Sequence, residues 1–215
     1  MKTRITIIVV LLISQIVIGQ EKKQKLDNRV NLVTGANQLL LFNGFNIEAN
    51  LYYNRFAFDY SHGFSLDFSN DALSGAEAEQ GIAVHMPYST GFGMGYRFTE
   101  WFNIRVEPKF HKFEIYYDGE TQTGENLIGD YKTFSLGLGA YFNWRPFENS
   151  ETLLKGIVIA PSVRYWPKVG ESLDGGSFDY ENKITGQSET HQALEVGINN
   201  TPFIVNVSLG YSIEF

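Results

Sequence analysis

Large apolar side chains alternate with small or polar ones along most of this sequence. The final stretch, FIVNVSLGYSIEF (203–215), shows the pattern clearly, because every odd position from Phe203 to Phe215 is large and apolar. Among its even positions, only Ile204 is strongly apolar. A period of two places successive side chains on opposite faces of an extended chain. The stretch therefore predicts a strand with one apolar and one polar face.

The same alternation recurs upstream and predicts further strands. They fall at 45–53, 56–68, 91–98, 102–110, 134–144 and 157–166, with a first strand at about 30–41, where LLLF interrupts the pattern. In FHKFEIYY the apolar parity changes between Phe110 and Phe113, just after Pro108. Proline and a parity change together are typical of a β-bulge, which we expect here. The total is eight strands.

The connections between these strands alternate in length. Short turns are expected near 54–55 and 99–100 with a modest connection at 145–155, and long loops at 69–89, 118–130 and 168–202. We interpret HQALEVGINNTP (191–202) as loop, and Asn43-Gly44 as a tight turn on the long-loop side. This rhythm and an even strand number are typical of outer-membrane proteins. The fold class predicted is all-β: an eight-stranded antiparallel up-and-down transmembrane β-barrel with short periplasmic turns and long extracellular loops.

The face opposite the apolar one carries charges in mid-strand. In a soluble sandwich this face would meet water. In a membrane barrel it would line the lumen, where charges need partners because unpaired buried charges are costly. The eight residues comprise four acids and four bases, which suits a closed interior. The predicted lumen charge network is Glu48, Asp59, Arg97, Arg105, Glu107, Lys109, Arg164 and Glu214.

Aromatic residues collect at the predicted strand ends, as expected where a barrel meets the two membrane–water interfaces. We expect one girdle at the inner end and one at the outer end. The inner girdle includes Tyr53, Trp101 and Trp144, and the outer one includes Tyr117, Tyr165 and Trp166.

The first residues, MKTRITIIVVLLISQIVIGQ, combine a basic start, a short apolar run and small residues at Val17 and Gly19. These features predict a secretory signal peptide at 1–19, since the run is too short to span a membrane. A short periplasmic segment at 20–29 and a barrel domain at 30–215 would follow. Loss of two basic residues with the signal would change the net charge from -7 to -9, which disfavours nucleic acid as a partner. The absence of cysteine excludes disulfides and Cys-ligated metals.

The signal sequence, the alternating strands and the terminal GYSIEF resemble small outer-membrane β-barrel proteins of the OmpA/OmpX type. The stretch GFGMGYRFTEWFNIRVEPKFHKFEIYY also resembles uncharacterised outer-membrane barrel proteins. The resemblance implies location in the outer membrane of a Gram-negative bacterium, in contact with lipid and lipopolysaccharide. It also implies that the barrel-insertion machinery reads the last strand. By position, the residues in that role would be Leu209, Tyr211, Ile213 and Phe215.

A barrel of eight strands is just wide enough for its own side chains to fill, so we expect a largely plugged lumen and a structural or surface-interaction role. A narrow pore or transporter for small solutes or ions is the first alternative, and a soluble periplasmic ligand-binding barrel is the second. The three long loops hold thirteen acids against Lys168 and Lys183, a charge of -11. Such loops either stay solvated or bind divalent cations or basic partners.

Catalysis needs a nucleophile positioned by a base, and some small barrels act on lipids. Here His85 lies near Ser89 in sequence and His191 near Ser188, while His62 and His111 lie in strands. None of these forms a recognisable catalytic motif, and no metal-ligand spacing occurs. We therefore expect no enzyme activity and no cofactor.

Overall fold

The protein, as a computed structural model, is described over residues 26–68, 81–197 and 199–215. The predicted signal peptide therefore lies outside the described residues. Strands dominate this part of the chain, together with a five-residue helix α2 (Ala36–Leu40) and the short 3₁₀ turns η2 (Leu153–Gly156) and η3 (Asp174–Gly176). The strands are β1 (Arg29–Gly35), β2 (Phe45–Tyr53), β3 (Phe56–Phe68), β4 (Ile82–Arg97), β5 (Phe102–Tyr117), β6 (Leu127–Phe142), β7 (Ile157–Tyr165), β8 (Lys168–Glu171), β9 (Ser177–Asn182), β10 (Gln187–Gln192) and β11 (Phe203–Glu214).

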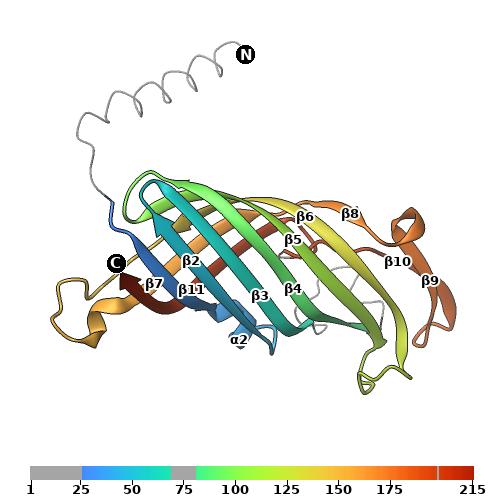
Figure 1. Cartoon of the computed structure of the whole chain (residues 1–215). Helices are drawn as coiled ribbons and strands as arrows, with labels where there is room; N and C mark the ends of the chain where they lie inside the picture. Colours follow the sequence, from blue (N-terminus) through green and yellow to red (C-terminus); the bar gives the residue numbers. More distant parts are fainter. Residues whose placement is uncertain (1–25, 69–80, 198) are drawn as a thin grey trace, which may run out of the picture.

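The sheet closes on itself as an eight-stranded antiparallel barrel (Figure 1). Neighbours run in the order β5-β4-β3-β2-β1-β11-β7-β6, and the pairing of β5 with β6 completes the circle. The seventh wall strand is interrupted: β7 pairs with the inner part of β6, and β8 pairs with the part beyond. Pro167 lies at the interruption, and proline has no N–H to donate to a ladder. The predicted fold class is thus the one observed.

The first strand is shorter than predicted, because β1 ends at Gly35 and α2 begins at Ala36. The expected strand over 36–41 is wrong. Three successive leucines, 39 to 41, cannot all face one side of a strand, whereas a helical turn can expose them together. At the other end, Arg29 is the first residue of β1 and fully buried, so the barrel begins one residue before the predicted boundary.

The long connections are also shorter than predicted, because β4 begins at Ile82 and β6 at Leu127. Within the expected loop 168–202, β8 extends the barrel wall, and β9 pairs with β10 as a separate hairpin (Figure 1). His191 and Gln192 belong to β10, while the described residues 193–197 and 199–202 lie outside strands and helices. The sequence pattern missed these strand segments because they lie beyond the part of the wall with apolar outward-facing residues. There, polar residues occur on both faces of the strands.

The predicted β-bulge in β5 is wrong. The ladder between β5 and β6 runs without a break from Phe102 to Ile115, and the register shifts lie in β4, between His85 and Tyr88, and at the end of β5, between Ile115 and Tyr116. Phe113 faces inward like His111, two residues before it. The parity of β5 does not change from Asn103 to Ile115. What changes is the interior, which is charged in one half of the barrel and apolar in the other.

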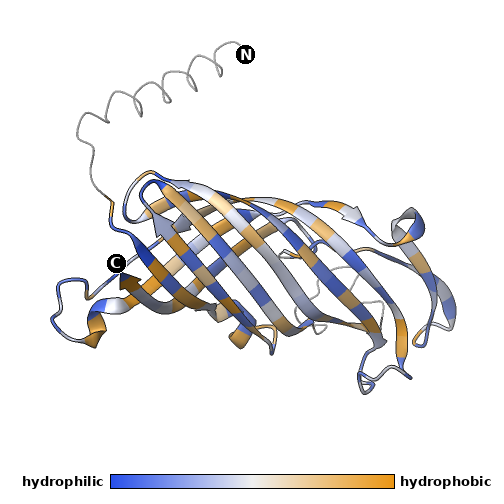
Figure 2. Cartoon of the chain, in the orientation of Figure 1, coloured by the Kyte–Doolittle hydropathy of each residue, from blue (hydrophilic) through white to orange (hydrophobic). Residues whose placement is uncertain are grey.

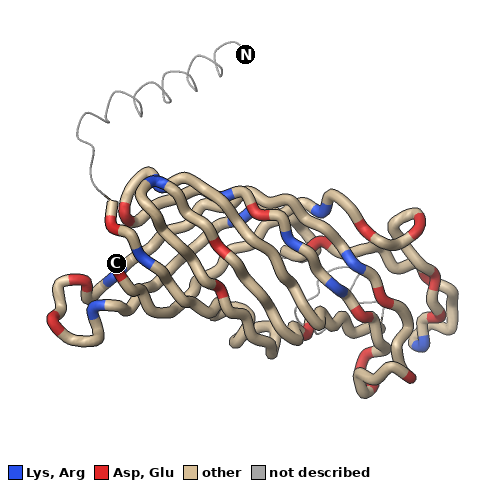
Figure 3. The backbone as a smooth tube through the Cα atoms, in the orientation of Figure 1, with Lys and Arg blue, Asp and Glu red and all other residues tan. Residues whose placement is uncertain are grey.

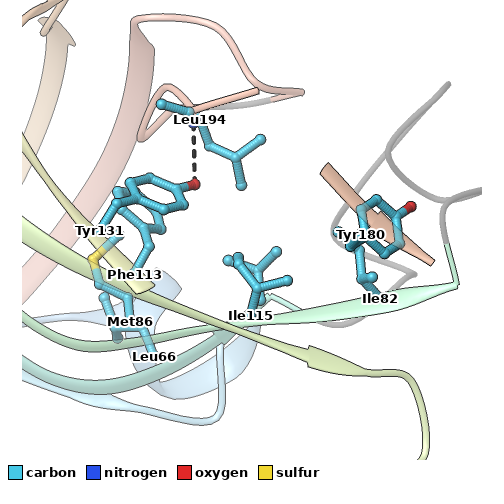
Figure 4. Close-up of a cluster of buried hydrophobic side chains, with 10 residues drawn as sticks. Leu66, Ile82, Met86, Phe113, Ile115, Tyr131, Tyr180 and Leu194 are labelled. Atoms are coloured by element: carbon cyan, nitrogen blue, oxygen red, sulfur yellow. Dashed lines mark hydrogen bonds between the residues drawn. The ribbon is translucent and has the colours of Figure 1, made fainter. Parts of the chain in front are cut away.

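The apolar half of the interior is a compact cluster (Figure 4). Phe113 and Tyr131 stack with their ring centroids 5.0 Å apart, and the Tyr131 hydroxyl accepts a 3.2 Å hydrogen bond from the Leu194 N–H. The loop after β10 is thereby attached to the barrel wall. The cluster comprises Leu66, Ile82, Val84, Met86, Phe113, Ile115, Tyr131, Tyr180, Ala193 and Leu194.

The barrel exterior is apolar. Hydrophobic and hydrophilic positions alternate along the strands in Figure 2. Outside the apolar cluster, most large hydrophobic side chains of the wall are exposed on its outer surface. Phe92, Met94 and Leu138, for example, lie on the barrel wall and are 55–60 % exposed. None of the helices in the described residues is long and apolar enough to cross a membrane.

Candidate functional site

The barrel interior holds most of the predicted charge network. Seven of the eight predicted residues are buried, each at most 6 % exposed. They come from five different strands, and Figure 3 shows basic and acidic positions interspersed along the barrel. Strand periodicity explains this placement, because each charged residue shares its face with other inward residues of the same strand. The seven are Glu48, Asp59, Arg97, Arg105, Glu107, Lys109 and Arg164.

The eighth predicted residue, Glu214, is not in the lumen. Its exposed side chain lies at the end of β11 and accepts a hydrogen bond from Arg145, while Lys155 Nζ lies 3.3 Å from it. Both partners belong to the connection between β6 and β7, which the sequence predicted as a modest connection at 145–155. Glu214 therefore fastens this turn to the last strand.

Arg105 is the centre of the network. Its guanidinium donates to Asp59 Oδ2 at 3.1 Å and to the Tyr52 hydroxyl at 2.7 Å, and also to Asn50. Its Nε–H donates to Asn103 Oδ1 at 2.7 Å, and Glu48 Oε1 lies 3.4 Å from Nη1. Arginine suits this position because its five donors are fixed in one plane and can reach several acceptors together.

A second group lies beside Arg105. Arg164 Nη2 is 3.5 Å from Glu48 Oε2, and Lys109 Nζ is 3.9 Å from Glu107 Oε1. Glu107 Oε2 accepts hydrogen bonds from the Tyr141 hydroxyl and, at 3.0 Å, from Trp166 Nε1. Three cations and three carboxylates thus meet in this part of the interior, counting Arg105, Asp59 and Glu48. Such pairing offsets the cost of burying each charge.

A third group closes the inner end, and of its charged residues the sequence reasoning predicted Arg97 but missed Arg29 and Glu100. Arg29 donates to the Glu100 carboxylate, and Arg97 Nη2 does so at 2.7 Å. Both guanidinium groups also lie over the Tyr52 ring, at 4.9 and 5.0 Å from its centroid. Arg29 lies on the same face of β1 as Asn31 and Val33, because it precedes them by two and four residues. Extending the predicted first strand by one residue would therefore have placed Arg29 in the lumen. Glu100 lies in a turn, where periodicity gives no signal.

The predicted aromatic girdles are partly observed. Tyr53, Trp101 and Trp144 are exposed near the inner turns, and Tyr165 is exposed on the outer half of β7. Trp166 was placed wrongly, because it is buried in the lumen against Glu107. The break at Pro167 lets Trp166 continue the inward face of β7. Tyr117 contacts the β9–β10 hairpin: its hydroxyl donates to the carbonyl of Glu181 in β9, and Lys183 lies over its ring.

The histidines form no catalytic triad in the described residues. Ser89 contacts His111, with its Oγ 2.9 Å from Nδ1, instead of His85 as expected from sequence proximity. His85 Nδ1 lies 2.6 Å from Asp67, and His191 Nε2 lies 3.2 Å from the Tyr131 hydroxyl. His62 stacks among aromatic rings on the exterior. No carboxylate is placed on the second nitrogen of His111, so this Ser–His pair lacks the orienting acid that a triad requires.

Some carboxylates of the predicted long loops form ion pairs or hydrogen bonds with other residues of these loops. Lys183 pairs with Glu120, and Lys168 pairs with Glu171. The hydrogen bond from Asn182 lowers the pKa of Glu189 below its usual range, with further bonds from Tyr180 and Thr185. Burial and the hydrogen bond to Glu189 raise the pKa of Tyr180 to about 12. Within the described residues, no group of three or more His, Asp or Glu side chains is arranged to hold a metal ion.

No protein-family model matches the sequence, and neither does any curated protein. Solved structures similar to this chain include Ail, the attachment invasion locus protein of Yersinia pestis, with 13% identity, a TM-score of 0.42, and coverage of 87% of this chain and 100% of that one. A major outer membrane protein from Thermus thermophilus shows 12% identity, a TM-score of 0.42, and coverage of 87% and 98% respectively. At these values the comparisons carry no argument, and the fold is taken from the strand pairing of this chain.

Proposed function

We propose that this protein spans the outer membrane of a Gram-negative bacterium as a barrel with a closed lumen, and that it serves a structural or surface-interaction role. The exterior supports the membrane setting. Soluble monomers rarely expose a contiguous apolar patch of more than a few hundred Å². Here apolar side chains cover the outward face of strand after strand, while the charges lie inside. Lipid is the medium that suits a barrel with apolar side chains outside and charged side chains inside.

The closed lumen rests on one observation: ion pairs join strands that are not neighbours in the wall. Arg105 on β5 reaches Glu48 on β2, and Arg164 on β7 reaches the same carboxylate. In the order of the barrel, β5 and β7 lie on opposite sides of β2. These pairs therefore cross the interior, and Tyr52, Tyr141 and Trp166 occupy the space beside them.

Planar-bilayer recording tests the closed lumen. We expect the purified protein to insert without stable conductance steps. A double variant, Glu48→Ser with Arg164→Ser, removes both ion pairs of Glu48 and keeps the net charge, so we expect it to gain small steps. Large, stable steps from the unmodified protein would instead favour the alternative of a narrow pore or transporter.

Fractionation tests the membrane setting separately. The mature protein should sediment with outer membranes, resist extraction by alkaline carbonate, and run faster on gels when unheated than when boiled. N-terminal sequencing of the same fraction checks cleavage after Gly19. Recovery of the protein in the soluble periplasm would contradict the proposal and favour a ligand-binding barrel there.

The acidic outer surface supports the interaction role. Its excess of carboxylates would attract basic partners, and divalent cations could bridge it to the phosphates of lipopolysaccharide. Titration calorimetry with Ca²⁺ and Mg²⁺ on protein in nanodiscs tests the proposed binding of cations, and absence of uptake would exclude it.

Recognition of Leu209, Tyr211, Ile213 and Phe215 by the insertion machinery belongs to the same proposal. All four side chains point outward at the end of the chain and are 40–68 % exposed.

A further inference from the structure

The barrel contains a cavity of about 90 Å³ between its charged and its apolar halves. Lys109, Arg164 and Ser61 line its polar side, and Trp166 lies beside them. Space for one water molecule takes roughly 10–15 Å³, so the cavity has room for about six to nine groups of that size. It is therefore large enough for a small organic molecule.

The polar side of the cavity is positively charged. Its described lining includes the buried cations Lys109 and Arg164 and no carboxylate, because Glu48 and Glu107 lie outside the lining. Lys109 Nζ donates to the Ser61 hydroxyl, and Glu107 Oε1 lies 3.9 Å away, beyond hydrogen-bond distance, so N–H groups of Lys109 stay available to other acceptors. The cavity is thus built to receive an anionic group.

Within the described residues, two polar atoms at the cavity have no hydrogen-bond partner. His111 lines the cavity and is 1 % exposed; its Nδ1 contacts Ser89, while its Nε2 has no hydrogen-bond partner. Gln38 of α2 also lines the cavity, and its buried Oε1 has none. A buried polar atom without a partner costs free energy, and a polar ligand group in the cavity would remove that cost.

The opposite side of the cavity is apolar. Leu66 and Met86 belong to the apolar cluster of Figure 4, and Phe42, Phe68 and Val196 complete this side. A ligand that suits both sides must carry an anionic head and a short apolar tail. The head would meet Lys109 and Arg164, and the tail would meet the cluster.

The wall beside the cavity is bridged by a helix where strand pairing ends. In the described residues, β1 pairs with β11 up to Ser208, so Phe203–Val207 pair with β7 on one side and with no strand on the other. On the facing strand, Phe45–Ile47 pair with β3 alone. Helix α2 covers this gap, where Asn37 Nδ2 donates to the Val205 carbonyl at 2.6 Å. Asn37 and Val205 both line the cavity, which therefore reaches the outer wall here.

From these observations we infer that the cavity is a binding site for a short-chain carboxylate of about six to nine non-hydrogen atoms. The site depends on the closed barrel and its side-chain placement. It does not depend on the proposed membrane location or on the absence of conductance, so the experiments on those points can fail independently of this one.

Three probes of equal chain length test the inference on the folded protein in nanodiscs: hexanoate, hexanol and hexylammonium. Titration calorimetry should show hexanoate binding at least tenfold more tightly than hexylammonium, with hexanol between them. Equal affinity for hexanoate and hexylammonium, or no binding of hexanoate, would overturn the inference. This comparison uses the unmodified protein and needs no variant to fold.

Matched variants locate the binding. A Cβ at Gly63 would lie 3.6 Å from Leu66 and Ser89, an ordinary contact, so Gly63→Leu should fold and fill the cavity. We expect at least a tenfold loss of hexanoate affinity. Thr90→Leu is the control, because Thr90 lies at the exterior, where its hydroxyl contacts that of Tyr60, and should leave affinity unchanged. Lys109→Met should abolish the preference for hexanoate over hexanol. Unchanged affinity in Gly63→Leu would place the binding elsewhere and overturn the inference.

Discussion

The indole ring of Trp166 lies directly over Gly137 on the neighbouring strand, so close that a Cβ at Gly137 would be 1.7 Å from Trp166 Cδ1. The glycine thus provides the space in which the indole reaches Glu107, 3.0 Å from its Nε1. Gly93 provides similar space for Asp59. Inward glycines such as Gly137 and Gly93 therefore provide the space that one particular large or charged side chain occupies.

Gly137→Ala should displace Trp166 and break its bond to Glu107. Overpacking of this kind costs about 1–3 kcal/mol. We expect a lower temperature for loss of the compact gel form and a change in tryptophan emission. Gly170→Ala is the control, because a Cβ there meets nothing within 4 Å. Equal stability of the two variants would contradict the close contact.

Arg105→Met should destabilise the barrel strongly, because it leaves Glu48 and Asp59 buried with fewer partners. Breaking a buried ion pair from one side costs about 3–5 kcal/mol. Lys155→Met is the comparison: its pair with Glu214 is exposed, and pairs of that type contribute about 0–1 kcal/mol. Urea unfolding in phospholipid vesicles measures both. Similar free energies of unfolding for the two variants would show that the interior network is not what stabilises the barrel.

The β9–β10 hairpin should open as the pH falls. Hydrogen bonds from Asn182 and Tyr180 lower the pKa of Glu189 in the folded state, so its ionised form favours folding. The stabilisation is complete well above the ordinary value of 4.5 and is lost as the pH falls through the lower folded value. Amide exchange of the hairpin, corrected for intrinsic rates, should therefore accelerate below about pH 4.5. Glu189→Gln should reduce this pH dependence, and an identical profile in that variant would exclude Glu189 as its source.

Phe215→Ser should reduce assembly of the barrel if the insertion machinery reads the last strand. The matched control is Phe203→Ser, which removes a similarly exposed phenyl group from the same face at the other end of β11. The heat-modifiable fraction in isolated outer membranes measures assembly. We expect it to fall several-fold for Phe215→Ser and little for Phe203→Ser. Equal effects would indicate a general loss of apolar surface.

The sequence by itself determined that the wall has eight strands and which face of each points inward, but it missed β8, β9 and β10 and the helix that replaces the end of the first predicted strand. Side-chain alternation is a local property, since φ and ψ of an extended chain alone place neighbours on opposite faces. It was enough to predict that Glu48, Arg105 and Arg164 point to one side and Phe92 and Leu138 to the other. The even number of strands and the alternating connections then predicted closure.

Tertiary structure decided which inward residues meet. Arg29 and Glu100 are distant in sequence, and their pairing depends on the register between strands and on a turn without periodicity. The inward residues of β5 change from charged to apolar at Phe113, where they pack into the apolar cluster. From the sequence alone, this change is interpreted as a bulge. Alternation places Trp166 on the same face as Arg164, but its indole reaches Glu107 only because Gly137 on another strand leaves space for it. Long-range partners of this kind depend on how the barrel closes, and a local pattern holds no information about them.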